Sequence, residues 1–184
     1  MKAKYFNERD FIKLNESYWE IIKIEHSHFG RGKANLTFII KNLENGSTLT
    51  KNFNPDEEIE GVDVEKRKIN FLFMKDKDVY FLDEDNKKYK LEKNKIGNKV
   101  NFLKKNLDIK GIFIDDELIG VEFPIKAVYE VISAPPNVKG NSEKTNSKIV
   151  TIETGAQISV PLFINVGDKI LINLEKGEYV ERAK

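Results

Sequence analysis

The chain of 184 residues contains no cysteine, which excludes a disulfide scaffold, thiolate zinc sites and catalysis by a thiol. It has two histidines, His26 and His28, with no third nitrogen or sulfur ligand nearby in the sequence, so we predict no metal site. A phosphate-binding G-x-x-x-x-G-K-[ST] loop is also missing, and Gly30-x-Gly32 lacks the third glycine of a dinucleotide fingerprint. These absences leave no catalytic constellation, and we expect a protein that is not an enzyme and has no catalytic residue and no cofactor.

Apolar runs of about 20 residues, the length needed to cross a bilayer, are missing as well. The opening residues, MKAKYFNERDF, contain no apolar segment of the signal-peptide kind. The 31 basic and 30 acidic residues leave a net charge of +1. This balance excludes a strongly basic nucleic-acid wrapper, although charge can still gather locally. We expect a soluble, cytoplasmic protein without membrane contact.

Short apolar runs with turn residues between them dominate the sequence. Leu36, Phe38 and Ile40 alternate, and Asn45-Gly46 after them predicts a two-residue hairpin turn. Two more hairpins are predicted from runs that flank KDKD and DDE: Ile69–Met74 with Val79–Leu82, and Ile112–Ile114 with Leu118–Phe123. Five later strands are expected at Val128–Ile132, Ile149–Ile152, Ile158–Ile164, Lys169–Leu174 and Glu178–Val180.

This succession of short strands indicates an all-β protein made of small barrels rather than a parallel sheet. One short amphipathic helix is predicted, because Ile96, Val100 and Leu103 recur at helical spacing. Residues 54–61 are acidic and turn-rich, which is typical of a linker, and Phe123-Pro124 ends a strand. We therefore predict three β-modules of about 60 residues each, with the boundaries 1–62, 63–127 and 128–184.

The segment 26–35, HSHFGRGKAN, is the most unusual loop. Gly30 and Gly32 flank Arg31, one of only four arginines, and Lys33 follows. Glycine opens backbone angles that other residues avoid, so we expect a tight tip that projects Arg31 away from the sheet. The pattern is open to two interpretations: a solubilising hairpin end, or a guanidinium presented to a phosphate-bearing partner.

Two other sets of polar residues have weaker signals. The acidic runs Asp83-Glu84-Asp85 and Asp115-Asp116-Glu117 fall at hairpin tips and are interpreted as solvated turns rather than acid–base pairs. In the last third, Pro161 within a strand pattern predicts an edge strand or a bulge. Tyr179 and Arg182 place a ring and a cation near the end of the sequence, a combination suited to RNA contact.

Together these features resemble the bacterial translation elongation factor P family. The last third carries the most specific part of the resemblance, in Lys148 through Gly167 with Val160-Pro161-Leu162-Phe163, followed by Gly177-Glu178-Tyr179-Val180 and Arg182. Segment 26–35 resembles the family's functional loop, in which a glycine-flanked basic residue is modified. The resemblance implies a KOW/SH3-like first module and two OB-fold modules.

The resemblance also implies a translation factor whose partners are the ribosome, peptidyl-tRNA and rRNA. Such a factor binds between the peptidyl-tRNA and exit sites and relieves stalling at consecutive prolines by positioning the peptidyl-tRNA. We expect it to act as a monomer. Tyr179 and Arg182 are implied as RNA contacts, together with the loop Gly140-Asn141-Ser142, which stands where the family usually has Gly-Asp-Thr.

The functional loop departs from the commoner pattern, because Arg31 follows Phe29-Gly30 where the family usually has lysine after Pro-Gly. Lysine-specific modifications are therefore excluded at this position. Family members with arginine there imply rhamnosylation of Arg31 by an arginine rhamnosyltransferase. Two alternatives remain open: a specialised paralogue of the factor, and a generic OB-fold RNA-binding protein.

Overall fold

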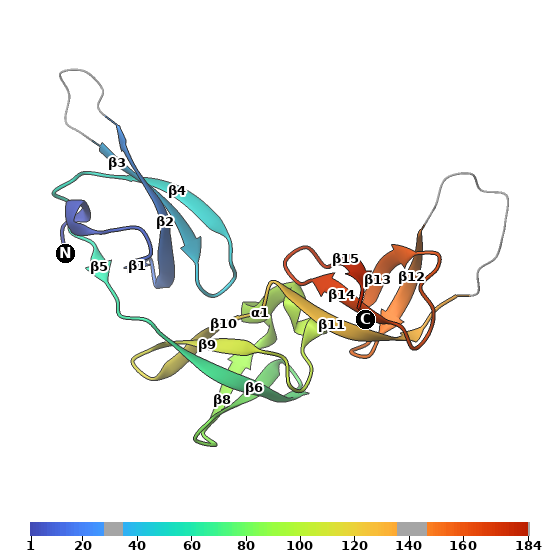
Figure 1. Ribbon diagram of the computed structural model, residues 1–184. Coiled ribbons are helices and arrows are strands. Elements are labelled where there is room, and N and C mark those ends of the chain that lie inside the picture. Colours follow the sequence, from blue (N-terminus) through green and yellow to red (C-terminus); the bar gives the residue numbers. More distant parts are fainter. Residues whose placement is uncertain (28–34, 136–146, 184) are drawn as a thin grey trace. The chain divides into compact units, whose positions relative to one another are not determined.

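The computed structural model describes residues 1–27, 35–135 and 147–183, whose backbone is built mainly from antiparallel strands (Figure 1). These strands form three five-stranded sheets, which confirms the all-β class. The backbone groups into two compact units. The first contains Met1–Ile69, Phe73–Gly97 and Lys110–Glu122, and the second contains Asn70–Leu72, Asn98–Ile109 and Phe123–Lys184.

The first sheet has the strand order β4-β3-β2-β1-β5 and follows a short 3-10 helix, η1 (Ala3–Tyr5). Its strands are β1 (Phe11–Leu14), β2 (Ser17–Ser27), β3 (Asn35–Asn42), β4 (Thr48–Phe53) and β5 (Glu60–Gly61). Asn15 and Glu16 connect β1 to β2 with φ angles of 49° and 61°. Two consecutive positive φ angles are the type I′ geometry that matches the twist of paired strands.

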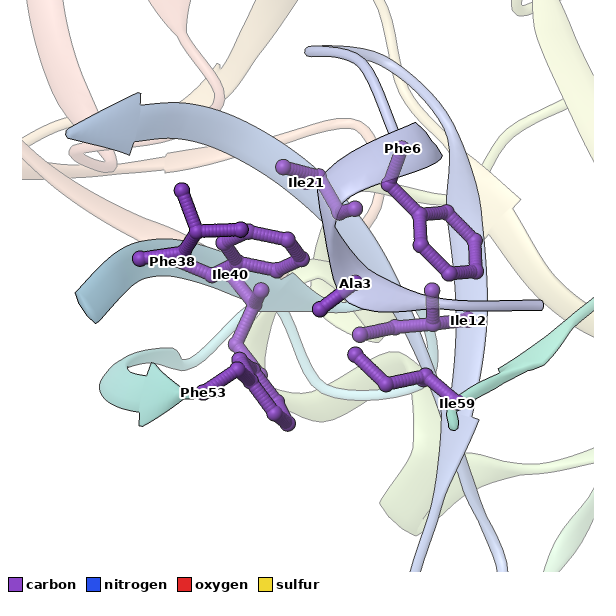
Figure 2. Packing of buried hydrophobic residues seen from close by; sticks show 9 residues of the cluster. Ala3, Phe6, Ile12, Ile21, Phe38, Ile40, Phe53 and Ile59 are labelled. Carbon is purple, nitrogen blue, oxygen red and sulfur yellow. The ribbon is translucent and has the colours of Figure 1, made fainter. Parts of the chain in front are cut away.

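The core of the first sheet follows the predicted alternation. Leu36, Phe38 and Ile40 are all buried, and they join one cluster with Ala3, Phe6, Ile12, Ile21, Phe53 and Ile59. Figure 2 shows these side chains meeting from several strands. The loop after β3 spans residues 43–47, so it is longer than the predicted two-residue turn. The reason is Asn42, whose Oδ1 accepts hydrogen bonds from the backbone of Glu44 and Asn45.

The prediction that residues 54–61 form a linker is wrong. Ala3 N donates a hydrogen bond to Glu57 O at 2.8 Å, and Asp56 Oδ1 lies 2.8 Å from Lys4 Nζ. Ile59 is buried in the first core, and β5 pairs with β1. The acidic side chains of this segment are exposed, which is why its composition resembles that of a linker. Its backbone and the buried side chain of Ile59 nevertheless close the module.

The second sheet has the order β10-β9-β6-β7-β8. Its strands are β6 (Glu65–Lys75), β7 (Asp78–Asp83), β8 (Lys88–Glu92), β9 (Ile109–Ile114) and β10 (Glu117–Glu122). Both hairpins predicted here are confirmed, and their two-residue turns are Asp76-Lys77 and Asp115-Asp116. A separate apolar cluster of Leu43, Ile112, Ile114 and Ile119 joins the β3–β4 loop to β9 and β10 within the first unit.

The predicted helix is shorter than its periodicity suggests. α1 (Lys93–Ile96) is a single turn, and a 3-10 helix, η2 (Gly97–Phe102), continues the chain. Gly97 has a φ of 66°, which ends the α-helix because left-handed backbone cannot propagate it. Ile96 and Leu103 are both buried, but Ile96 lies in α1 whereas Leu103 directly follows the end of η2.

The third sheet has the order β13-β12-β11-β14-β15. Its strands are β11 (Lys126–Ser133), β12 (Ser147–Ile152), β13 (Gln157–Pro161), β14 (Lys169–Asn173) and β15 (Glu178–Arg182). Pro161 is the last residue of the edge strand β13, as its missing N–H predicts. The strand therefore stops before Ile164, which is nevertheless fully buried.

Candidate functional site

The predicted functional loop connects the longest hairpin of the first sheet. β2 and β3 pair in antiparallel register as far as Ser27 opposite Asn35. Arg31 is the middle residue of the seven that separate these two positions in the sequence. Gly30, Arg31, Gly32 and Lys33 lie outside the described residues, so their roles stay predictions. In the described stem, the pairing of Ser27 with Asn35 holds the two ends of this segment next to each other.

Specific contacts anchor the stem below that segment. Ile21 pairs with Ile40 and Lys23 with Ile39, so Ile22 is an extra residue that makes a β-bulge. Bulges bend a strand and increase its twist, which sets the direction of the hairpin beyond this point. Ile24 N donates a hydrogen bond to Glu8 Oε1 at 3.2 Å, and the Ile24 side chain packs against the first core. The stem is therefore tied to the core on both sides of the bulge.

The second predicted RNA contact consists of Tyr179 and Arg182, which both lie in the C-terminal strand β15. Tyr179 is opposite Ile172 and Arg182 is opposite Ile170, with a register shift between the two pairs. Residues three apart on a regular strand face opposite sides, but the bulge places Tyr179 and Arg182 on the same face. Ile170 and Ile172 are buried, whereas the Arg182 side chain is 58% exposed.

Arg182 also has a structural partner that the sequence did not reveal. Its Nη2 lies 2.7 Å from Asp168 Oδ1, and Asp168 Oδ2 accepts a hydrogen bond from Asn165 N at 2.8 Å. The ion pair uses part of the guanidinium, which has five N–H donors. The exposed remainder can contact a phosphate. Gly140, Asn141 and Ser142 lie outside the described residues.

Arg67 makes several contacts that the sequence did not predict. The only feature of the sequence that pointed to this residue was the scarcity of arginine. Its guanidinium lies 4.1 Å from the centre of the Phe113 ring, and its Nη2 lies 2.5 Å from Asp116 Oδ1. This hydrogen bond and the positive charge of Arg67 lower the pKa of Asp116. The prediction of a solvated turn is confirmed, because Asp115, Asp116 and Glu117 are all exposed, and the ion pair of Asp116 with Arg67 is an addition that the sequence did not reveal.

In the other acidic run, Glu84 and Asp85 are exposed turn residues as predicted, but the prediction is wrong for Asp83, which ends β7 and is only 9% exposed. Its carboxylate accepts hydrogen bonds from Lys87 N at 2.8 Å, Tyr89 OH at 2.9 Å and Asp85 N at 3.0 Å. Burial by itself raises the pKa of Asp83, but these hydrogen bonds outweigh burial and lower it. Asp83 thus organises the β7–β8 turn and is not an exposed acid.

Neither metal nor membrane features emerge from the described part of the chain. Among residues 1–27, 35–135 and 147–183, no group of three or more histidine, aspartate or glutamate side chains is placed to hold a metal ion. No helix in these ranges is long and apolar enough to cross a membrane.

Comparison with known proteins decides the family. Three family models match consecutive segments: the elongation factor P KOW-like domain at residues 7–59, the elongation factor P OB domain at 64–121, and the elongation factor P C-terminal domain at 128–182. Elongation factor P from Dictyoglomus thermophilum is 32% identical over 94% of both chains. The chain belongs to the elongation factor P family. It is a translation elongation factor with a KOW-like domain and OB domains, as the sequence resemblance implied.

Other relatives in the elongation factor P family show a similar level of identity. The protein from Desulfitobacterium hafniense is 34% identical over 94% of both chains, and the one from Mycoplasmopsis synoviae is 34% identical over 89% of both. Among solved structures, a translation initiation factor 5A from Methanococcus jannaschii aligns with 67% of this chain and 90% of its own, with 16% identity and a TM-score of 0.47.

Proposed function

We propose that this elongation factor binds the ribosome between the peptidyl-tRNA and exit sites and stimulates peptide-bond formation at consecutive prolines. The observation that carries the proposal is the β2–β3 hairpin, whose stem is paired as far as Ser27 and Asn35, and the glycine-flanked Arg31 is midway between these two residues in the sequence. In this proposal the hairpin reaches the acceptor end of the peptidyl-tRNA. The protein works in the cytoplasm as a monomer, and its contacts are with tRNA and rRNA.

The mechanism that we propose is positioning rather than catalysis. The ring of proline fixes its φ angle and makes its amine a sterically hindered nucleophile. A tRNA end held in an attack-ready geometry recovers rate, because a misplacement of about 1 Å can cost on the order of a hundredfold. The charge of arginine is permanent at cellular pH, so Arg31 contributes electrostatics and reach without proton transfer.

We further propose that Arg31 is rhamnosylated by an arginine rhamnosyltransferase. The support is the residue type, since arginine excludes the lysine-specific modifications. The test is the mass of the intact protein from its native host, where one added deoxyhexose on the Arg31 peptide is expected. An unmodified peptide in growing cells would contradict this part of the proposal and leave the positioning role in place.

The decisive experiment on function is Arg31→Ala in a polyproline reporter, in a strain lacking its ordinary factor. Activity should fall to the level of the strain without factor, while the thermal midpoint reported by Trp19, the only tryptophan, stays unchanged. Arg9→Gln is the matched control, because Arg9 is an exposed arginine of the same module and should retain full activity. Wild-type activity of Arg31→Ala would refute the assignment.

Two further measurements separate the alternatives. A generic OB-fold RNA-binding protein would co-sediment equally with ribosomes whose exit site is vacant or occupied, whereas the proposed factor should prefer the vacant site. A specialised paralogue would bind in the same place but fail to rescue the polyproline reporter.

A further inference from the structure

The outward face of the second sheet carries a partly exposed aromatic pair that the function described so far does not use. Phe73 in β6 and Tyr80 in β7 stack with ring centres 4.7 Å apart and an interplanar angle of 24°. Phe73 is 43% exposed. A single exposed apolar residue is common on protein surfaces, but apolar side chains that gather on one face mark an interaction site.

The alternation of the neighbouring strands shows that this is the solvent side. Along β7, Val79 and Phe81 are buried, whereas Tyr80 between them is half-buried and points the other way. Tyr80 is opposite Lys90 in β8, and Leu82 is opposite Lys88. The ring pair therefore lies on the outer face of three adjacent strands, away from the module's core.

A cation completes this face. Lys88 Nζ lies 5.9 Å from the centre of the Phe73 ring. Lys90 is held by Asp78 at 3.6 Å, but among the described residues no carboxylate lies within 4 Å of Lys88 Nζ. The rings are thus accompanied by an ammonium group that is free to meet a phosphate.

Stacked rings beside an unpaired cation match the chemistry of unpaired nucleotides. Every base has a π-face that can continue an aromatic stack, and its phosphate complements a lysine. In OB folds the second and third strands, here β7 and β8, are the ones that commonly bind oligonucleotides. We propose that Phe73, Tyr80 and Lys88 form a stacking site for an unpaired RNA nucleotide. This inference deepens the proposed function, on which it rests for its RNA partner, by adding a contact separate from the β2–β3 hairpin.

The test uses the full chain and a short single-stranded oligoadenylate, with an RNA duplex of the same length as the comparison. In an NMR titration at low salt, the single strand should shift the ring signals of Phe73 and Tyr80, and the duplex should not. Phe73→Leu and Tyr80→Leu keep apolar volume but remove a ring. Each should weaken binding at least fivefold, the lower end of the range for one base–aromatic stack.

Two controls separate binding from folding. Tyr5→Leu is matched, because Tyr5 is 60% exposed with Lys4 Nζ 5.4 Å from its ring centre, yet Lys4 is already paired with Asp56. It should leave binding unchanged. Phe73→Tyr should retain binding, since it restores the ring, and Trp19 fluorescence should show that each variant is folded.

The outcomes separate this site from the proposed function. Equal affinity of the leucine variants and the wild type for oligoadenylate would overturn the stacking site, even where polyproline activity persists. Loss of ribosome binding without loss of oligoadenylate binding would assign the face to a protein partner and also overturn it. A failure of the Arg31 experiment would leave the titration result unaffected.

Discussion

Gly120→Ala should weaken the first unit, because the structure leaves no space for a methyl group there. A Cβ built on Gly120 would lie 2.6 Å from the carbonyl oxygen of Leu43, closer than real Cβ contacts come. One of the two backbones must move by several tenths of an ångström, at the junction formed by Leu43, Ile112, Ile114 and Ile119. Overpacking of this kind costs about 1–3 kcal/mol. For a chain of this length the melting temperature should fall by about 2–12 °C.

Trp19 makes this measurable, since the only tryptophan is in β2 of the same unit. Its fluorescence melt should report the loss, while Glu117→Ala, an exposed change in the same strand as Gly120, should leave the midpoint in place. Truncation by Leu43→Ala should not rescue Gly120→Ala, because the close contact is with the backbone oxygen. An unchanged midpoint for Gly120→Ala would refute the close packing of the β3–β4 loop against β10.

Three further outcomes are expected. Tyr129→Phe removes the hydroxyl that donates to the buried carbonyl of Phe102 at 2.8 Å, so calorimetry should show a loss of about 1–3 kcal/mol. The lowered pKa of Asp83 means that its ionised form stabilises the fold above about pH 4 and that this contribution disappears as the pH falls through the lowered pKa. Urea midpoints should therefore fall for Asp83→Asn at pH 7 and differ much less from the wild type at pH 2. Alanine at both Tyr179 and Arg182 should weaken ribosome co-sedimentation more at high salt than at low salt, because salt screens the remaining lysines. Unchanged binding at both salt concentrations, by a variant shown to be folded, would leave these residues only a role in closing the sheet.

Much of the fold was readable from local pattern. The alternation around Phe38, the turns between β6 and β7 and between β9 and β10, and the edge position of Pro161 all depend on neighbours in sequence. Strand periodicity and turn chemistry act over a few residues, so they can be recognised without knowing what packs above them. The C-terminal motif residues were sufficient to recognise the family.

Other features depend on residues distant in sequence. Residues 54–61 have the composition of a linker, but they belong to the first module because Glu57 O accepts a hydrogen bond from Ala3 N. Burial of Asp83 requires Tyr89 OH, and pairing of Asp116 requires Arg67 from another strand. Composition determined that this protein has no thiol chemistry, and pattern determined that it is built from short strands. Only the tertiary structure decided which acids are buried and which rings meet at the surface, because burial and ion pairing depend on what packs alongside a residue.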